Sequence, residues 1–269
     1  MVPAIVKRHP VRFGLLAVVL ATLVLAACLV SRQLPDGPIP TETYAALSGK
    51  ADGPVVVVLP GIQDDMESFK ASGIVEQIQQ ANADATVILA AAEFGYYMDR
   101  SLLERLQREI INPAVVAGHS EFWMAGASLG GFGALLYERA HPEFLTGLVL
   151  MAPFTGRKEL AKNIAKAGGL AQWQPGPAPS VIHPDDVPYE VWRMLKQFTQ
   201  QPERAARLWL ICGRDDKFYL AAQQIAGVIP DSHYVEPDGG HKWKVWAPAA
   251  GEVFSRIFQN APDSAGPQD

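Results

Sequence analysis

Six short strand-like runs recur along the chain, five of them apolar, and the stretches between them carry mostly helical patterns. The runs are rich in β-branched or small apolar residues without polar alternation, which is typical of strands buried on both faces of a parallel sheet. They cover residues 55–59, 86–91, 122–127, 148–152, 208–212 and 233–236. Strands that alternate with helices require right-handed crossovers. The pattern therefore predicts an α/β fold, a mostly parallel twisted sheet with helices on both faces.

The helical patterns fall between these runs, with one long interruption. Helices are expected over residues 66–81, 101–111 and 129–139. Between residues 154 and 205 no further strand is predicted, and two helical pieces flank a loop with five prolines. An insertion this late in the sheet lies over the carboxyl ends of the strands, where open α/β sheets bind ligands. We therefore expect a small helical cap at residues 154–205.

The first thirty residues have the layout of an export signal. Three basic residues precede an uncharged apolar run over residues 13–30, and small residues stand directly before Cys28. A basic stretch followed by an apolar one is typical of secretory signals, and Leu-Ala-Ala-Cys resembles the lipobox of bacterial lipoproteins. That resemblance implies removal of residues 1–27 and lipidation of Cys28. An uncleaved transmembrane anchor, long enough to cross a bilayer, and a plain cleaved signal remain alternatives.

Each of these alternatives places the rest of the chain outside the cytoplasm, in the cell envelope of a bacterium. A lipid on Cys28 would hold it on the periplasmic or outer side of a membrane, and Leu29 in place of an aspartate favours the outer membrane. Residues 28–50 are rich in proline without apolar periodicity, so we predict a tether there. The domain is expected over residues 51–260, followed by a disordered tail at 261–269.

Composition excludes several classes of partner. The chain has 23 basic and 28 acidic residues, and removing the three basic residues of the leader leaves 20 against 28. An acidic body without basic runs argues against nucleic acid. A lipidated Cys28 leaves Cys212 without a disulfide partner, and Cys212 ends an apolar run, which suits a buried residue. No metal site or cofactor is indicated.

Ser128 lies in a G-x-S-x-G sequence between the third apolar run and the helix at 129–139. Strand, sharp turn and helix are the context that a nucleophile elbow needs. Gly126 and Gly130 lack a Cβ and allow neighbouring backbone to approach. The helix N-terminus favours the negative charge that develops near Ser128. We assign Ser128 as a nucleophile, with a small residue packed in a turn as the alternative.

A serine nucleophile needs a base, and the base needs an orienting acid. His241 follows the last predicted strand, and Asp215 and Asp216 follow the strand before it. All of these positions lie on loops at the carboxyl ends of strands, the side on which Ser128 is presented. Position alone leaves both Asp215 and Asp216 as candidates for the acid. Asp238 better suits a turn.

The remaining assignments concern the oxyanion hole and the pocket. Two backbone N–H groups are needed, and we expect them from Leu129 and from Ile62, with Gln63 as second choice for the latter. Five side chains are candidates for the substrate pocket, although packing in the core or cap is the alternative for most of the aromatic ones. They are Gln63, Tyr96, Tyr97, Trp173 and Trp192.

Two stretches resemble the α/β-hydrolase family. GASLGGFGALLYERAHPEFLTGLVLMAP (126–153) looks like the elbow, helix and next strand of esterase-type members, and GGHKWKVW (239–246) looks like their histidine loop. The family often has glycine followed three residues later by aspartate. Gly213 and Asp216 match this spacing, so the resemblance favours Asp216. Many members have His-Gly where this chain has Pro60-Gly61, a departure that concerns the second oxyanion donor.

The sequence thus predicts a serine hydrolase that acts on a small-molecule acyl substrate, a carboxylic ester or thioester, through an acyl-enzyme. A lipid or anchor at the N-terminus would attach it to a membrane. An acyltransferase with the same triad is one alternative. Dehalogenation or cofactor-free oxidation is a second, which a serine nucleophile disfavours. The third is a non-catalytic binding protein of the envelope, whose mark would be a broken triad.

Overall fold

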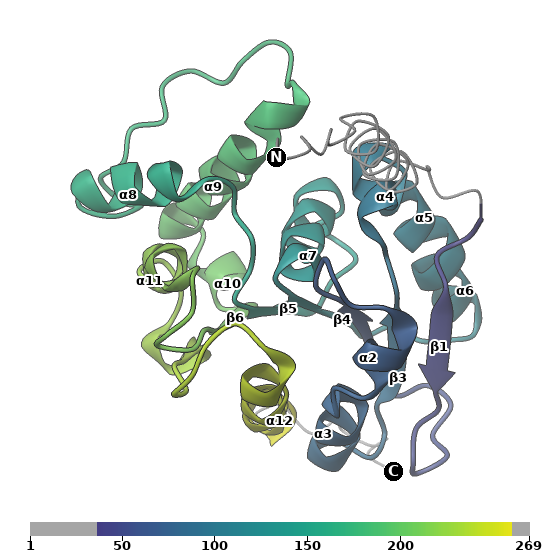
Figure 1. The fold of residues 1–269 in the computed structure, drawn as a ribbon. Helices are drawn as coiled ribbons and strands as arrows, with labels where there is room; N and C mark the ends of the chain where they lie inside the picture. The colour runs from purple at the N-terminus through teal and green to yellow at the C-terminus, as the bar shows by residue number, and fades with distance from the viewer. Residues whose placement is uncertain (1–36, 260–269) are drawn as a thin grey trace, which may run out of the picture. The chain divides into compact units, whose positions relative to one another are not determined.

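The fold is built on a seven-stranded sheet with the strand order β1-β3-β2-β4-β5-β6-β7 (Figure 1). The computed structural model describes residues 37–259. Only the pairing of β1 with β3 is antiparallel among these strands. The strands are β1 (Thr41–Tyr44), β2 (Val55–Leu59), β3 (Thr86–Ala90), β4 (Phe122–Ala127), β5 (Gly147–Met151), β6 (Leu208–Ile211) and β7 (Tyr234–Val235). The predicted class, a mostly parallel α/β sheet, is confirmed.

The parallel strands point their carboxyl ends to one edge of the sheet. Val55 of β2 lies opposite Thr86 of β3 and Phe122 of β4, so these three strands start level with one another. Every residue of β2, β4, β5 and β6 is buried. Their unbroken apolar runs are explained by helices that cover both faces. We call the edge at which these strands end the carboxyl edge, and the opposite one the amino edge.

Helices lie on both sides of the sheet (Figure 1). α3 (Ile74–Ala81) and α12 (Trp243–Gln259) pack side by side on one face, and α7 (Leu129–Ala140) lies on the other. The other helices are α2 (Met66–Lys70), α4 (Phe94–Met98), α5 (Leu102–Arg105), α6 (Asn112–Val116), α8 (Lys158–Lys166), α9 (Val187–Gln197), α10 (Pro202–Ala205) and α11 (Tyr219–Ala226).

Two helices differ from their sequence predictions. The helix expected over residues 66–81 is divided into α2 and α3. Gly73, directly before α3, adopts φ 79° in the left-handed region, so the helix cannot run through it. The helix expected over 101–111 changes to a π-helix at Leu106–Ile111 and then continues as α6. The short α4, and both α11 and α12, were not predicted.

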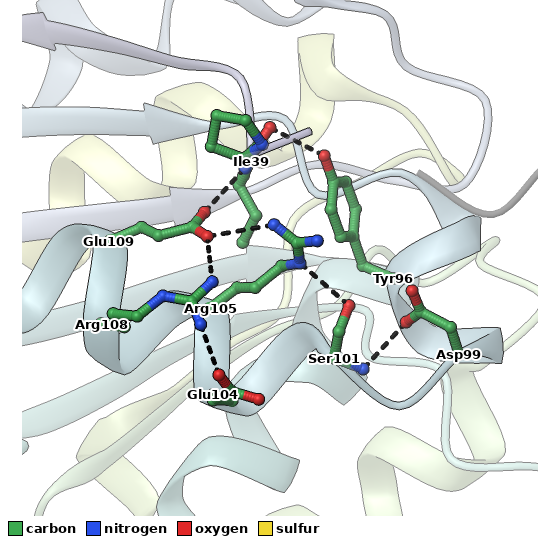
Figure 2. A network of polar contacts seen from close by, with 9 residues as sticks. Ile39, Tyr96, Asp99, Ser101, Glu104, Arg105, Arg108 and Glu109 are labelled. Atoms are coloured by element: carbon green, nitrogen blue, oxygen red, sulfur yellow. Dashed lines mark hydrogen bonds and ion pairs between the residues drawn. The ribbon is translucent and has the colours of Figure 1, made fainter. Parts of the chain in front are cut away.

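The chain enters the sheet earlier than the sequence predicted. Strand β1 lies inside the expected tether at residues 28–50, which is therefore wrong for its last part. Its residues alternate between exposed and half-buried, so no continuous apolar run marks it. Figure 2 shows how its start is held: Tyr96 of α4 donates to the Pro38 carbonyl at 2.9 Å, and the Ile39 amide donates to Glu109 at 2.9 Å.

The segment between β5 and β6 forms the predicted cap without a strand. It contains α8, α9 and α10, and a proline-rich loop joins the first two. Arg193 of α9 donates to the carbonyls of Pro175, Gly176 and Pro177 at 2.7, 2.7 and 3.0 Å. Lys196, one turn further along the same helix, donates to two more carbonyls of the loop. Two cationic side chains thus hold this loop, in which Leu170 and Trp173 are buried but residues 174–183 are not.

The expected signal peptide at 1–27, the lipidation site Cys28 and the tail at 261–269 lie outside the described residues. Residues 38–259 belong to one compact unit. Among residues 37–259, none of the helices has the length and apolar character that crossing a bilayer requires.

Candidate active site

Ser128 sits at a sharp turn between β4 and α7, with φ 52° and ψ −109°. A non-glycine residue in this region is strained and persists only where its surroundings fix it. The end of strand β5 fixes Ser128, since the Ser128 amide donates to the carbonyl of Met151, the last residue of β5, at 2.9 Å. The Phe154 amide donates back to the Ser128 carbonyl at 2.8 Å. The turn is therefore held from both sides of the serine.

The glycines of the elbow are required by close backbone contacts. A Cβ on Gly126 would lie 2.3 Å from the backbone of Gly130, and one on Gly130 would lie 2.3 Å from the Leu59 carbonyl oxygen. Neither neighbour is a flexible side-chain end that could move aside. The G-x-S-x-G pattern thus records how closely β2, β4 and α7 meet around Ser128.

Asp216 and His241 form a bonded pair at the carboxyl edge. His241 Nδ1 donates to the Asp216 carboxylate and lies 2.9 Å from each of its oxygens. The Asp216 carboxylate also accepts the Phe218 amide at 2.9 Å and is 6% exposed. Since Nδ1 carries the hydrogen toward the carboxylate, Nε2 is left as the acceptor. The pair has the geometry of an acid that orients a base.

The neighbouring Asp215 takes no part in this pair. Its side chain is exposed, and its amide donates to the Gly239 carbonyl at 3.0 Å. A Cβ on Gly213 would lie 2.2 Å from the same carbonyl oxygen, so the acid loop and the histidine loop touch through backbone. Of the two aspartates that the sequence left open by position, Asp216 is the one that meets the histidine.

Aromatic rings enclose the His241 imidazole. Phe218 and Trp246 both contact it edge to face, with ring centroids 5.1 and 4.6 Å away. Phe218 in turn contacts Phe154, the residue whose amide bonds to Ser128. A series of packed rings therefore connects the base to the segment that holds the nucleophile.

The loop after β2 meets the histidine loop through Asp64. One oxygen of its carboxylate accepts both the Gly61 amide at 2.7 Å and the Trp243 indole N–H at 2.8 Å. A Cβ on Gly61 would lie 3.8 Å from that of Ser128, so this loop passes directly beside the nucleophile. Asp64 thus joins the expected oxyanion loop to the residues that follow His241.

The expected oxyanion donors occupy suitable places in the chain. Leu129 is the first residue of α7, where a backbone N–H has no partner within the helix. Ile62 follows Gly61 in the loop beside Ser128, and its side chain is 55% exposed. Gln63, the second choice, is also exposed. Both backbone assignments stay predictions.

Three of the expected pocket side chains are packed inside the protein. Trp192 is fully buried and donates to the Thr155 carbonyl at 2.9 Å, so it supports the segment after β5. Trp173 is buried against Tyr189 in the cap. Tyr96 is buried and turned toward Pro38. The pocket assignment of these three is corrected, because a buried ring has no surface to offer a substrate.

Tyr97 is the aromatic candidate that lies close to the elbow. Its hydroxyl donates to the Leu129 carbonyl at 3.2 Å. A Cβ on Gly133 would lie 2.6 Å from the Tyr97 hydroxyl oxygen. Burial raises the pKa of Tyr97. The side chain therefore supports the first turn of α7 as a neutral donor.

Cys212 is fully buried beside the acid loop, as the sequence predicted, and burial raises the pKa of its thiol. Among the described residues there is no group of three or more histidine, cysteine or acidic side chains that could hold a metal ion.

Sequence reasoning missed Asp64 and Phe218 as members of the site. Asp64 and Trp243 are 179 positions apart, and nothing local marks their contact. Phe218 follows Asp216 by two residues, and this closeness in sequence to the predicted acid could have marked it as part of the site. Trp243 and Trp246 were indicated by the resemblance of residues 239–246 to a family histidine loop.

Comparison with known proteins gives one family and one fold. Residues 35–250 match the model of the Esterase family, described as "Putative esterase". No curated protein sequence matches the chain.

Solved structures share the architecture at low identity. MPT51 of Mycobacterium tuberculosis is 16% identical with a TM-score of 0.54, over 85% of this chain and 97% of that one. An S-formylglutathione hydrolase of Staphylococcus aureus is 13% identical with a TM-score of 0.52, over 84% and 99%. A fluorophosphonate-binding serine hydrolase of the same species is 13% identical with a TM-score of 0.52, over 82% and 99%. At such identities the likeness establishes the fold.

Proposed function

Because the chain belongs to the Esterase family and is an α/β-hydrolase enzyme, we propose that it cleaves a carboxylic ester or thioester through a Ser128 acyl-enzyme. The observation that carries the proposal is the bonded pair of Asp216 and His241, at the same edge of the sheet as the strained turn of Ser128. Along the chain, the nucleophile Ser128 comes first, then the acid Asp216 and then the base His241, which is the order that this fold uses.

In the first half of the reaction, the Ser128 hydroxyl attacks the acyl carbonyl while His241 Nε2 takes its proton. The bond from the acyl carbon to the leaving group then breaks, C–O in an ester or C–S in a thioester, and the imidazolium gives the proton to the departing alkoxide or thiolate. Asp216 keeps Nδ1 protonated and stabilises the imidazolium. The negative charge on the tetrahedral oxygen is accepted by the amides of Leu129 and Ile62.

In the second half, His241 takes a proton from water, and the resulting hydroxide oxygen attacks the acyl carbon. The bond to the Ser128 oxygen breaks, Ser128 regains its proton from His241, and a carboxylic acid leaves. Both halves use the same three side chains, and water is the co-reactant of the second. An alcohol in place of water would give acyl transfer instead.

Asp64 has a positioning role in this proposal. Its carboxylate holds the Gly61 amide next to the donor at Ile62, and also the Trp243 indole two residues after the base. Trp243 packs on Trp246, which contacts the imidazole of His241. One carboxylate thus sets both loops relative to each other without touching the substrate.

We further propose that the enzyme is tethered to the bacterial cell envelope through its N-terminal segment, by a lipid on Cys28 or by the apolar run at residues 13–30. The support is the sequence pattern alone. Mass spectrometry of the chain purified from membranes would distinguish a lipidated Cys28 from an intact leader.

The test of the catalytic proposal is hydrolysis of p-nitrophenyl esters from acetyl to palmitoyl by the full chain, with fluorophosphonate labelling in parallel. Ser128→Ala should abolish both labelling and turnover, and His241→Ala should abolish turnover. His183→Ala, in the exposed part of the cap, is the matched control and should leave both unchanged. Adding a primary alcohol would reveal acyl transfer as ester product. If Ser128 fails to label and no ester is turned over, the chain is a binding protein and not a catalyst.

A further inference from the structure

The chain enters the described domain at the edge where the active site lies. Because β1 runs antiparallel to β3, its first residue, Thr41, pairs with Ala90 at the carboxyl end of β3. Pro38 and Ile39, just before it, are fixed there by Tyr96 and Glu109 (Figure 2). Cys28 precedes Pro38 by ten residues, which span at most about 35 Å when fully extended. A membrane attachment at Cys28, or through the apolar run that ends at residue 30, therefore keeps this entry point within about 35 Å of the attachment.

Helix α4 lies next to this entry point and has two contrasting faces. Tyr96, on its inner face, is buried and bonds to Pro38. Phe94 and Met98 are four residues apart and therefore share one face of the helix. Their exposed fractions are 44% and 63%. The helix that holds the start of the domain thus presents apolar side chains to the outside.

A further exposed apolar side chain lies at the same edge of the sheet as α4. Ile62, in the loop after β2, is exposed beside the active site. Asp65, Glu93 and Arg100 are exposed near these residues and give no excess of positive charge. Attraction to anionic lipid headgroups is therefore not the driving force. Burial of apolar side chains is the interaction that this surface can make.

We propose that the apolar face of α4, formed by Phe94 and Met98, rests in the surface of a lipid bilayer, so that the carboxyl edge and its ester-cleaving site face the membrane. The substrate class that fits this placement is an acyl ester carried in the bilayer. The inference rests on the proposed function in two respects, the tether and the hydrolase activity. Side chains of this kind enter the interface to about 5–10 Å in peripheral proteins.

The first experiment measures contact with lipid and does not depend on activity. The full chain with Met98→Cys is labelled with bimane, reconstituted in phosphatidylcholine vesicles and recovered by flotation. The parent chain gives the background from Cys28 and the buried Cys212. Leu47→Cys is the matched control, since Leu47 is 69% exposed and follows the end of β1, at the amino edge.

Brominated phosphatidylcholine should quench the label at residue 98 roughly two-fold and leave the label at residue 47 unchanged. If the chain floats with the vesicles and residue 98 is not quenched, the membrane-facing surface is wrong while the tether stands. If the label at residue 98 is as protected from a water-soluble quencher in detergent as it is in vesicles, and the chain is a dimer in detergent, a second copy covers α4 and the proposal is overturned. If the chain does not float at all, both the tether and the surface are wrong.

The second experiment measures what the surface does for the reaction. Met98→Glu should lower turnover of a long-chain ester dissolved in the vesicles about ten-fold. It should leave p-nitrophenyl acetate turnover unchanged, and Leu47→Glu should change neither rate. Equal rates for Met98→Glu and the parent on the vesicle ester would overturn the proposal. Loss of both activities in the parent itself would instead contradict the hydrolase assignment.

Discussion

The nucleophile elbow and the cap are both attached to the carboxyl ends of strands, yet they are held by different interactions. Around Ser128, the strands are buried, and a Cβ added to Gly126 or Gly130 would lie 2.3 Å from backbone atoms, so there is no room for another atom. In the cap, residues 174–183 of the loop between α8 and α9 include no buried side chain, and Arg193 donates to three of their carbonyls. The elbow is specified by packing, and the cap loop by a few polar bonds.

This difference bears on how each region tolerates change. Close-packed backbone transmits any added volume, because no neighbouring atom can move without moving a strand. A loop held by charge-assisted bonds to carbonyls can lose one bond and still close, since each bond is worth about 1.5–3 kcal/mol. The elbow should therefore fail as a unit, and the cap loop should loosen by degrees.

The largest expected effect comes from a methyl group at the elbow. Gly130→Ala places a Cβ against the Leu59 carbonyl oxygen, and we expect a loss of about 3 kcal/mol of folding free energy together with the loss of ester turnover. Gly176→Ala in the cap loop is the matched change: nothing lies within 4 Å of its Cβ position, although φ is +71°. There we expect about 1–2 kcal/mol from backbone strain and near-normal turnover.

Urea unfolding and p-nitrophenyl ester hydrolysis measure the two quantities. If Gly130→Ala proves no more harmful than Gly176→Ala, the contrast between packed elbow and loosely held loop is wrong.

The next effect separates two adjacent aspartates. Asp216→Asn keeps the shape of the side chain but removes the charge that stabilises the imidazolium, so kcat should fall about 10²–10⁴-fold with little change in KM. Asp215→Asn alters an exposed side chain next to it and should leave kcat unchanged. Steady-state kinetics on a short ester measures both. A comparable loss in both variants would mean that the loop, and not the carboxylate bonded to His241, matters.

The elbow could be predicted from sequence because its constraint is local. Ser128 and the two glycines that flank it lie within five residues, and strand β4 before them is wholly apolar. The triad partners could be placed because the fold fixes their order and their loops. Strand order in the sheet, by contrast, needs contacts that no single segment records.

What sequence could not give were contacts between distant segments and the direction of aromatic side chains. Trp192 lies on an amphipathic helix of the cap. The sequence alone does not distinguish a tryptophan that lines a pocket from the buried ring that is bonded to Thr155. Strand β1 lacks an apolar run because it is an edge strand of alternating exposure. Asp64 bonds to Trp243, which lies 179 positions further along the chain, and no pattern around either residue marks that contact.

Asp64 extends the comparison of elbow and cap, because its side chain makes polar bonds within the packed catalytic region. Asp64→Ala removes the acceptor for both Gly61 and Trp243, and kcat should fall about ten-fold through misplacement of the oxyanion loop and base. Trp243→Phe keeps a ring and removes only the indole N–H. If the two residues act as one unit, the double variant should be little worse than the poorer single variant.

Asp65→Ala is the control for this series. Asp65 caps α2 by accepting the Ser68 amide at 2.8 Å, so its loss should cost about 1 kcal/mol of stability and leave kcat unchanged. Additive losses in kcat for Asp64→Ala and Trp243→Phe would show that Asp64 acts on each loop separately and does not couple them.

The smallest effect is expected in the cap, where it tests whether polar bonds alone hold the loop. Arg193→Met keeps an apolar, unbranched side chain and removes the three hydrogen bonds to residues 175–177, together with the ion pair to Glu190. Hydrogen exchange should accelerate over residues 174–183, with at most a few-fold change in KM and none in kcat. Arg193→Lys should rescue only part of the protection, since one ammonium cannot reproduce the planar guanidinium fork. Unchanged exchange in Arg193→Met would mean that proline stiffness, and not the arginine, orders the loop, and the cap would then resemble the elbow in being fixed by its backbone.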